Sequence, residues 1–151
     1  MNEQEHVTIV KKLYDNLNRH DLTASNQYLA DNFHTVGPGA PGKLNRDESI
    51  EYTQRFIEAF PDLSFKVKDI VAQGNLVAVT WMSEGTHKNP LHGPTGMTIP
   101  TTNQKGSVPG SAIYEFRDGK IVRQEFYWDM VTLLMQLGVM EDIIQSGSTR
   151  R

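Results

Sequence analysis

The stretch from residue 64 to residue 87, SFKVKDIVAQGNLVAVTWMSEGTH, decides the fold class of this chain. In its first half hydrophobic residues such as Phe65 and Val67 alternate with lysines, and a period of two is typical of a β-strand. Its second half, residues 76–87, is a long run rich in β-forming residues. Gly74-Asn75 between them is a turn signal, so the stretch predicts two antiparallel strands joined by a tight hairpin.

The sequence after this hairpin predicts a second one. Residues 108–116 and 121–128 are two further β-rich runs, and Asp118-Gly119 between them is a strong signal for a two-residue turn. The connection that precedes these strands is rich in proline and glycine, and we expect residues 97–109 to form a long loop. After the last strand, leucines at residues 133–137 predict a short terminal helix.

The N-terminal part of the sequence has helical periodicity instead. Hydrophobic residues recur at offsets of three and four in residues 7–17 and again in residues 50–60, which predicts two amphipathic helices. Asn2 and Asn45 are each followed three residues later by a glutamate, the pattern of a helix N-cap. A short helix near Tyr28 and a short strand after it complete this part.

Helices first and antiparallel strands second indicate an α+β domain, with helices packed on one face of a curved sheet. The chain has 151 residues and shows no internal repeat or linker, so we expect one domain at residues 1–145 and a loose polar tail at residues 146–151.

Composition excludes several classes of function. The net charge of -3 leaves no surplus of lysine and arginine for binding nucleic acid. The sequence contains no run of about 18 apolar residues, so it predicts no membrane span. The chain has no cysteine, which excludes disulfides, thiol catalysis and thiolate metal sites. Residues 1–6 are polar and acidic and lack the features of a signal peptide, so we expect a cytoplasmic protein.

Five short motifs in a fixed order carry a family resemblance. They are Phe60-Pro-Asp-Leu63, Gly85-Thr-His87, Pro94-Thr-Gly96, Asp118-Gly-Lys-Ile121 and Asp129 just before Leu133-Leu-Met-Gln-Leu-Gly138. In this order and spacing the chain resembles the SnoaL-like polyketide cyclases, or ester cyclases, of the nuclear transport factor 2-like superfamily. The resemblance implies a cone-shaped α+β barrel, built from a curved, mainly antiparallel sheet with three N-terminal helices over a deep apolar pocket. It also implies a homodimer that needs no metal and no cofactor.

Asp129 is the first catalytic candidate. The resemblance implies that it acts as general acid/base in an intramolecular aldol ring closure of a polyketide ester. A carboxylate can take a proton from carbon next to a carbonyl if burial raises its pKa, and Asp129 follows three aromatic residues. An aspartate just before a helix is also a common N-cap, and the two roles are compatible.

His87 is the second catalytic candidate, because it ends a strand whose alternate residues are largely apolar. An ordinary strand-end histidine bonded to the backbone explains it equally well. Tyr127 shares a strand face with Asp129 and Glu125, so we expect the Tyr127 hydroxyl to bind substrate if Asp129 points into the pocket. Residues that would line the pocket or lie at its edge are Trp81, Phe56, Phe60, His34 and His92.

Two features depart from the family pattern: the connection at residues 97–109 is longer than usual, and Glu125 stands where a tryptophan is common. His87 and His92 are close in sequence, but no metal-binding motif accompanies them, so we expect no metal site.

Three functions remain open at this point. The first is a cofactor-free cyclase, lyase or isomerase acting on a small apolar carbonyl-bearing molecule. The second is a dehydratase or epoxide-hydrolase-like enzyme that uses His87 with a carboxylate. The third is a protein that binds a small molecule without converting it, since fold does not determine function. In all three we expect no nucleic-acid partner and no membrane partner.

Overall fold

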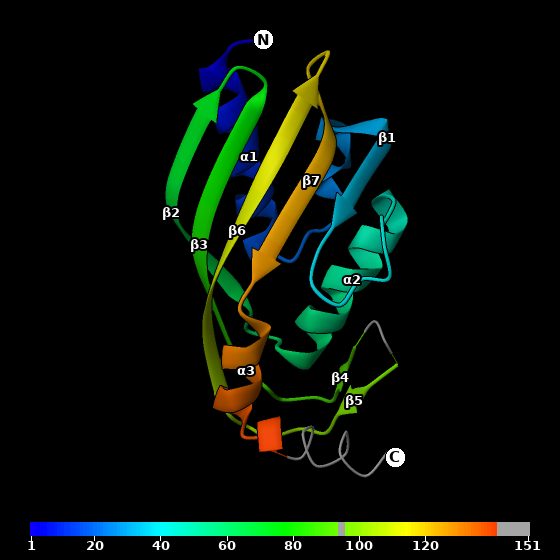
Figure 1. Cartoon of the computed structure of the whole chain (residues 1–151), viewed down its shortest axis with the longest axis vertical. Helices are drawn as coiled ribbons and strands as arrows, with labels where there is room; N and C mark the ends of the chain where they lie inside the picture. Colours follow the sequence, from blue (N-terminus) through cyan, green and yellow to red (C-terminus); the bar gives the residue numbers. More distant parts are fainter. Residues whose placement is uncertain (94–95, 142–151) are drawn as a thin grey trace.

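The computed structural model describes residues 1–93 and 96–141 (Figure 1). In chain order its elements are α1 (Glu3–Asn18), the 3-10 helix η1 (Ala24–Tyr28), β1 (Leu29–Val36), α2 (Arg46–Ala59), β2 (Ser64–Gln73), β3 (Leu76–Thr86), β4 (Leu91–His92), β5 (Thr98–Ile99), β6 (Lys105–Arg117), β7 (Lys120–Trp128) and α3 (Met130–Leu137). The predicted tail and Pro94 of the third motif lie outside the described residues. Within the described ranges, no helix has both the length and the apolar character needed to cross a membrane.

Five strands form one curved sheet in the order β1-β7-β6-β3-β2. The pairs β2–β3, β3–β6 and β6–β7 are antiparallel, and β1 runs parallel to β7. The predicted α+β class and mainly antiparallel sheet are therefore confirmed. The sheet is not a closed barrel, because its edge strands β1 and β2 lie at opposite ends of the order and do not pair with each other.

Both predicted hairpins are confirmed. β2 and β3 are joined at Gly74, whose φ of +60° lies in the left-handed region that glycine adopts without strain. β6 and β7 are joined at Asp118 and Gly119, with φ of +51° and +79°. Two consecutive positive φ values match the twist of the flanking strands, which explains why the Asp-Gly pair predicts this turn well.

The helices lie against one side of the sheet, with α1 behind β2 and β3 in the view of Figure 1. Their predicted N-termini are confirmed. The Asn2 side chain accepts a hydrogen bond from the backbone N–H of Glu5 at 2.9 Å. At α2, Asn45 and Glu48 form a reciprocal capping box with two bonds of 2.9 Å. These bonds satisfy backbone donors that the first turn of a helix leaves free.

The predicted long loop at residues 97–109 is wrong in extent. The structure places residues 105–109 in β6, where they pair with the last part of β3. Gly106 and Pro109 indicate a loop when the sequence is considered locally. The full length of β3 supplies a partner strand for them, and this tertiary pairing overrides the local preference.

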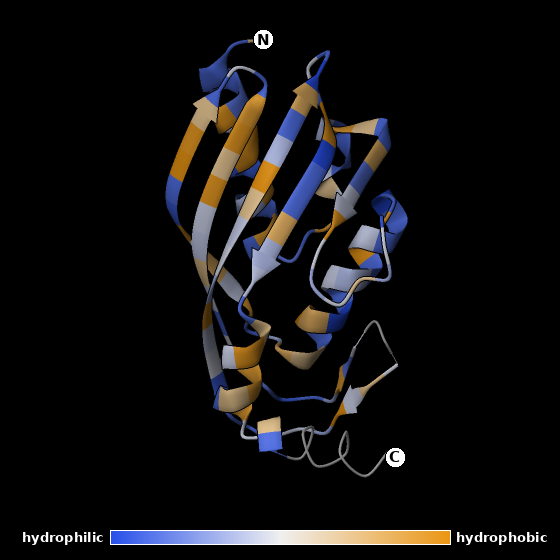
Figure 2. Ribbon diagram, in the orientation of Figure 1, coloured by the Kyte–Doolittle hydropathy of each residue, from blue (hydrophilic) through white to orange (hydrophobic). Residues whose placement is uncertain are grey.

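Two hydrophobic clusters form the core. One joins α1 to the hairpin half of the sheet, where Figure 2 shows orange, hydrophobic segments near the hairpin of β2 and β3. The other lies at the opposite end, where apolar residues of α3 meet Ala59, Phe60 and Val108. Both clusters contribute residues to one shared cavity.

Small residues on β6 keep the inner face of the sheet hollow. In register, Gly110 lies between Trp81 of β3 and Trp128 of β7, and Ala112 lies between Val79 and Phe126. A Cβ atom at Gly110 would lie only 2.5–2.6 Å from the Trp81 indole. The indole therefore covers the Gly110 backbone, and a larger residue on β6 would fill this space.

Gly110→Ala tests this arrangement. The added methyl group would force the Trp81 ring from its place, and overpacking of this kind costs about 1–3 kcal/mol of unfolding free energy. Urea unfolding measures the loss. Ser111→Ala, one residue away on the opposite strand parity, is the control and should change the unfolding free energy by no more than about 0.5 kcal/mol. Equal stability of the two variants would contradict the close packing of Trp81 on Gly110.

Candidate functional site

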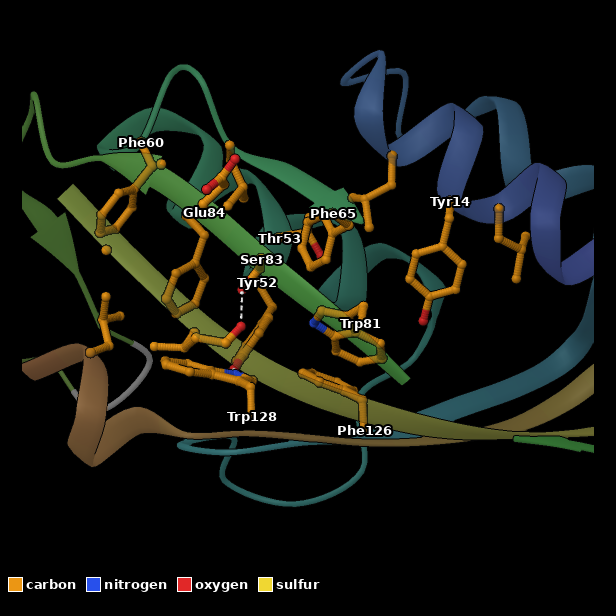
Figure 3. A pocket seen from close by; sticks show the side chains of 18 of the residues that line it. Tyr14, Tyr52, Thr53, Phe60, Phe65, Trp81, Ser83, Glu84, Phe126 and Trp128 are labelled. Atoms are coloured by element: carbon orange, nitrogen blue, oxygen red, sulfur yellow. Dashed lines mark hydrogen bonds between the residues drawn. The ribbon is translucent and has the colours of Figure 1, made fainter. Parts of the chain in front are cut away.

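An apolar cavity of about 160 Å³ lies between the inner face of the sheet and the helices (Figure 3). Its walls come from α1, α2 and α3 and from the strands β2, β3, β6 and β7. The aromatic residues that line it are Tyr14, Tyr52, Phe56, Phe60, Phe65, Trp81, Tyr114, Phe126 and Trp128. The predicted pocket residues Phe56, Phe60 and Trp81 are thus among those that line the cavity.

The middle of the cavity wall is an aromatic cluster of Tyr52, Phe56, Phe126 and Trp128. Phe56 and Trp128 meet edge to face at 5.4 Å between ring centroids, and so do Tyr52 and Phe126 at 5.4 Å. The Trp128 indole donates to the Tyr52 hydroxyl at 3.2 Å, and this hydroxyl donates to the Pro38 carbonyl at 2.7 Å. Burial raises the pKa of Tyr52 to about 12. The Tyr52 hydroxyl and the Trp128 N–H are therefore both used inside the protein.

A buried polar cluster lies at the α1 end of the cavity. The hydroxyl oxygens of Tyr14 and Tyr114 are 2.8 Å apart, and Gln124 donates from its side-chain amide to the Tyr114 hydroxyl at 3.1 Å. Burial raises the pKa of both phenols, that of Tyr14 with a further contribution from Tyr114. Both hydroxyls consequently stay protonated at neutral pH and can act as hydrogen-bond donors.

The structure places Asp129 outside this cavity. Its side chain is exposed, and its carboxylate accepts bonds from the backbone N–H of Thr132 at 3.0 Å and from the Thr132 hydroxyl at 2.7 Å. These bonds from Thr132 lower the pKa of Asp129. The N-cap interpretation of Asp129 is therefore confirmed. Its catalytic role stays a prediction.

His87 is fully buried behind the cavity wall. Its ring stacks on Phe60 with centroids 5.2 Å apart, and its Nδ1 accepts from the backbone N–H of Thr102 at 3.2 Å. The accepted bond leaves the ring proton on Nε2, which has no hydrogen-bond partner among the described residues. Burial lowers the pKa of His87, so the ring is neutral. Phe60 and not His87 contributes to the cavity lining.

The other predicted site residues are dispersed. Tyr127 is 57% exposed and lies on the outer face of β7. His92 is exposed on β4, where its Nδ1 lies 3.2 Å from the Thr98 hydroxyl. His34 is half-buried on β1, and Glu125 pairs with Arg123 at 2.9 Å. None of these four side chains is among the residues that line the cavity.

Sequence reasoning missed the polar cluster of Tyr14, Tyr114 and Gln124. Tyr14 was part of the predicted apolar stripe of the first helix, and Tyr114 and Gln124 lie on strands without any motif. The alternation of side chains along a strand could have indicated it, because Gln124 lies on the same face of its strand as Phe126 and Trp128. Both parities of β7 carry aromatic residues, however, so the pattern alone does not show which face is inside.

Residues 1–93 and 96–141 contain no candidate metal site. No three side chains of histidine, aspartate or glutamate come together there in a way that could hold a metal ion.

Comparison with known proteins decides the family. The sequence profile of the SnoaL-like polyketide cyclases matches residues 8–137. The chain belongs to the SnoaL-like polyketide cyclase family. A search of curated proteins finds no match.

Solved structures agree with this membership in the family. IdmH of Streptomyces antibioticus, described as a candidate polyketide cyclase, is 29% identical, with a TM-score of 0.73 over 88% of this chain and 98% of that chain. AclR of Streptomyces galilaeus, described as a candidate hydroxylase, is 23% identical, with a TM-score of 0.80 over 92% and 99%. TsrD of Streptomyces laurentii is 18% identical, with a TM-score of 0.78 over 93% and 99%. AclR and TsrD support the fold alone.

Two of the family motifs meet at one end of the cavity. Asp62, in the turn after α2, accepts from the backbone N–H of Thr86 at 2.7 Å and from the Thr86 hydroxyl at 3.0 Å. The adjacent stacking of Phe60 on His87 joins the same two segments. The hydrogen bonds from Thr86 lower the pKa of Asp62. Asp62 therefore fixes the turn against the end of β3.

Asp62→Asn tests this connection through the pH dependence of stability. When folding lowers the pKa of a carboxyl, the carboxylate stabilises the native state at every pH above the pKa it has in the unfolded chain. This stabilisation disappears as the pH falls through the pKa that the carboxyl has in the native state. We expect Asp62→Asn to be less stable than the wild type at pH 7 and the difference to shrink below about pH 4. Urea unfolding at several pH values measures it. Asp31→Asn, at an exposed position, is the control. If the difference in unfolding free energy between the wild type and Asp62→Asn stays constant with pH, the prediction is wrong.

Proposed function

We propose that this protein binds a small apolar carbonyl compound in the cavity and catalyses a ring closure or a related proton-transfer step without a cofactor. The observation that carries the proposal is a phenol pair at one end of an aromatic cavity. The volume of about 160 Å³ is close to the roughly 150 Å³ of an apolar protein cavity that accepts benzene. A group the size of one aromatic ring therefore fits.

The polar cluster has one more hydroxyl proton than it uses, which supports binding of a carbonyl oxygen. Tyr14 and Tyr114 have two hydroxyl protons, and the contact between their oxygens uses one of them. Gln124 donates into this pair and removes no proton from it. One phenolic proton is therefore left without an acceptor among the described residues. A carbonyl oxygen at this end of the cavity would accept it.

This free donor suits an aldol-type reaction. In an intramolecular aldol closure, a base takes a proton from the carbon next to one carbonyl, the role that the family resemblance implies for Asp129, and this carbon forms a bond to the carbon of a second carbonyl. The second oxygen then gains negative charge and takes up a proton. A donor fixed in a cavity that excludes water stabilises this charge strongly. The raised pKa of Tyr14 keeps its donor protonated throughout the neutral range, and membership in the family supports this class of reaction.

Tyr14→Phe tests the proposed role of the phenol pair. A thermal-shift screen with small aromatic esters and ketones first identifies a compound that the wild type converts. Loss of one donor to a developing oxyanion should then lower kcat about 100-fold or more. Tyr28→Phe removes a hydroxyl outside the cavity and is the matched control. Unchanged kcat in Tyr14→Phe would remove the phenol pair from the mechanism.

Asp129 can be tested separately, because asparagine and aspartate cap helices about equally well. We expect Asp129→Asn to lower the urea unfolding midpoint less than Asp129→Ala does, since asparagine can still cap the helix and alanine cannot accept from Thr132. Turnover by the stable Asp129→Asn variant then decides the catalytic role that the family resemblance implies. A loss of 100-fold or more would assign it, and turnover near the wild-type value would remove it.

A second candidate function is binding without conversion. Glu84 is the only acidic residue that lines the cavity within the described part of the chain. Its strand parity is opposite to that of Trp81 and Ser83, and its carboxylate lies 3.7 Å from Lys105. No described carboxylate therefore points into the cavity as a base. Binding of the screened compounds without turnover would favour this second function.

The homodimer that the resemblance implies stays a prediction. Large apolar side chains exposed on the outer face of the sheet include Val71, Ile113 and Tyr127, which come from three different strands. This face is where we would expect a second copy to pack.

A further inference from the structure

The Trp81 indole carries a buried hydrogen-bond donor that the protein does not use. Its side chain is 4% exposed, and its Nε1–H has no hydrogen-bond partner among the residues that the structure describes. The other tryptophan differs in this respect, because Trp128 donates its N–H to Tyr52. Buried donors without an acceptor are rare in proteins, since losing the hydration of a polar group is costly.

Trp81 contributes to the cavity wall, and the register of the sheet holds its N–H against the backbone of Gly110. Trp81 pairs with Gly110, which pairs in turn with Trp128, so the two indoles lie on either side of a residue without a side chain. Because a Cβ at Gly110 would lie 2.6 Å from Nε1, the nitrogen lies directly over the glycine. In Figure 3 the nitrogen is on the side of the ring that faces Tyr52 and Trp128.

Neighbouring side chains offer this donor no acceptor. Trp81 packs against Phe65 at 5.9 Å and Tyr14 at 5.6 Å between ring centroids. The Ser83 hydroxyl, also on the inner face of β3, donates to the Val108 carbonyl. A phenylalanine at position 81 would supply the same aromatic wall without the cost of an unused N–H. The indole therefore indicates an acceptor that enters the cavity from outside.

We propose that Trp81 is a specificity-determining residue whose Nε1–H donates to an oxygen of the bound ligand. This inference rests on the proposed function and deepens it. The ligand is then an uncharged compound with one ring-sized apolar part and an acceptor oxygen placed beside that part, such as an aryl ketone or aryl ester. A hydrocarbon of the same shape leaves the donor unpaired, and a site built for a hydrogen bond discriminates against such an analogue.

Two probes of nearly equal shape test this directly. Acetophenone carries a carbonyl oxygen where α-methylstyrene carries a CH₂ group. The chain has two tryptophans, so its ¹H–¹⁵N spectrum contains two indole signals, which the variants Trp81→Phe and Trp128→Phe assign. We expect acetophenone to shift the Trp81 indole proton downfield on binding. The Trp128 proton, already bonded to Tyr52, should not move downfield, and α-methylstyrene should not move the Trp81 proton downfield either.

Affinities give a second readout. A neutral hydrogen bond is worth about a 3- to 10-fold change in Kd. Trp81→Phe should therefore reduce the preference for acetophenone over α-methylstyrene by roughly this factor. Trp128→Phe removes an indole of the same size from the same cavity and should change both Kd values alike, leaving the preference as in the wild type.

The outcomes separate this inference from the proposed function. If both probes bind but the Trp81 proton does not move downfield with acetophenone, the inference is wrong and binding in the cavity still holds. A preference that survives in Trp81→Phe, or that Trp128→Phe reduces equally, would also overturn it. If neither probe moves an indole signal of the wild type, the cavity is not the binding site, and the proposed function fails together with the inference. The wild-type spectrum decides the matter even if Trp81→Phe does not fold.

Discussion

The contact of the Trp81 indole with the backbone of Gly110 is the constraint on which the rest of the site depends. A curved sheet must fill its concave face, and large side chains on adjacent strands normally do so. Here β6 carries Gly110 and Ala112 between the bulky residues of β3 and β7. Aromatic rings of β3 and β7 therefore flank β6 at Gly110, and the side chains of β6 at Gly110 and Ala112 are absent or small. The result is a hollow inside a well-packed domain, with helices closing it from the other side.

The two ends of this cavity differ in structure. At the end under α1, two phenols and an amide form a polar cluster in which every group is buried or half-buried. At the other end, Asp62 and Phe60 fasten the turn after α2 to the end of β3. Between these ends the wall is aromatic, and its indole and hydroxyl groups are used internally except at Trp81. Polarity is thus concentrated at a few fixed atoms, as in a site that orients a mainly apolar ligand.

The sequence alone predicted the class of fold well because the decisive signals are local. Alternation in residues 64–87, the Gly74 and Asp118-Gly119 turns and the two asparagine caps each act within a few residues, and each is found in the structure. The extent of β6 was missed because Gly106 and Pro109 have local preferences that a long partner strand overrides. The family resemblance supplied a carboxylate at Asp129, but whether a side chain at the end of a strand points inward depends on three-dimensional packing. Tyr14 and Tyr114 are 100 residues apart, and no motif indicates that their hydroxyl groups meet.

The parallel pairing of β1 with β7 also determines when this site can exist during synthesis. β1 joins the sheet only through β7, a strand that begins near residue 120. Pairings between segments so distant in sequence form late and slowly, because the entropy cost of closing a long loop comes before any favourable contact forms. Gln124, Phe126 and Trp128 all come from β7. On the ribosome, the nascent chain can build α1, α2 and the first hairpin early. The cavity is completed only after β7 and α3 have emerged.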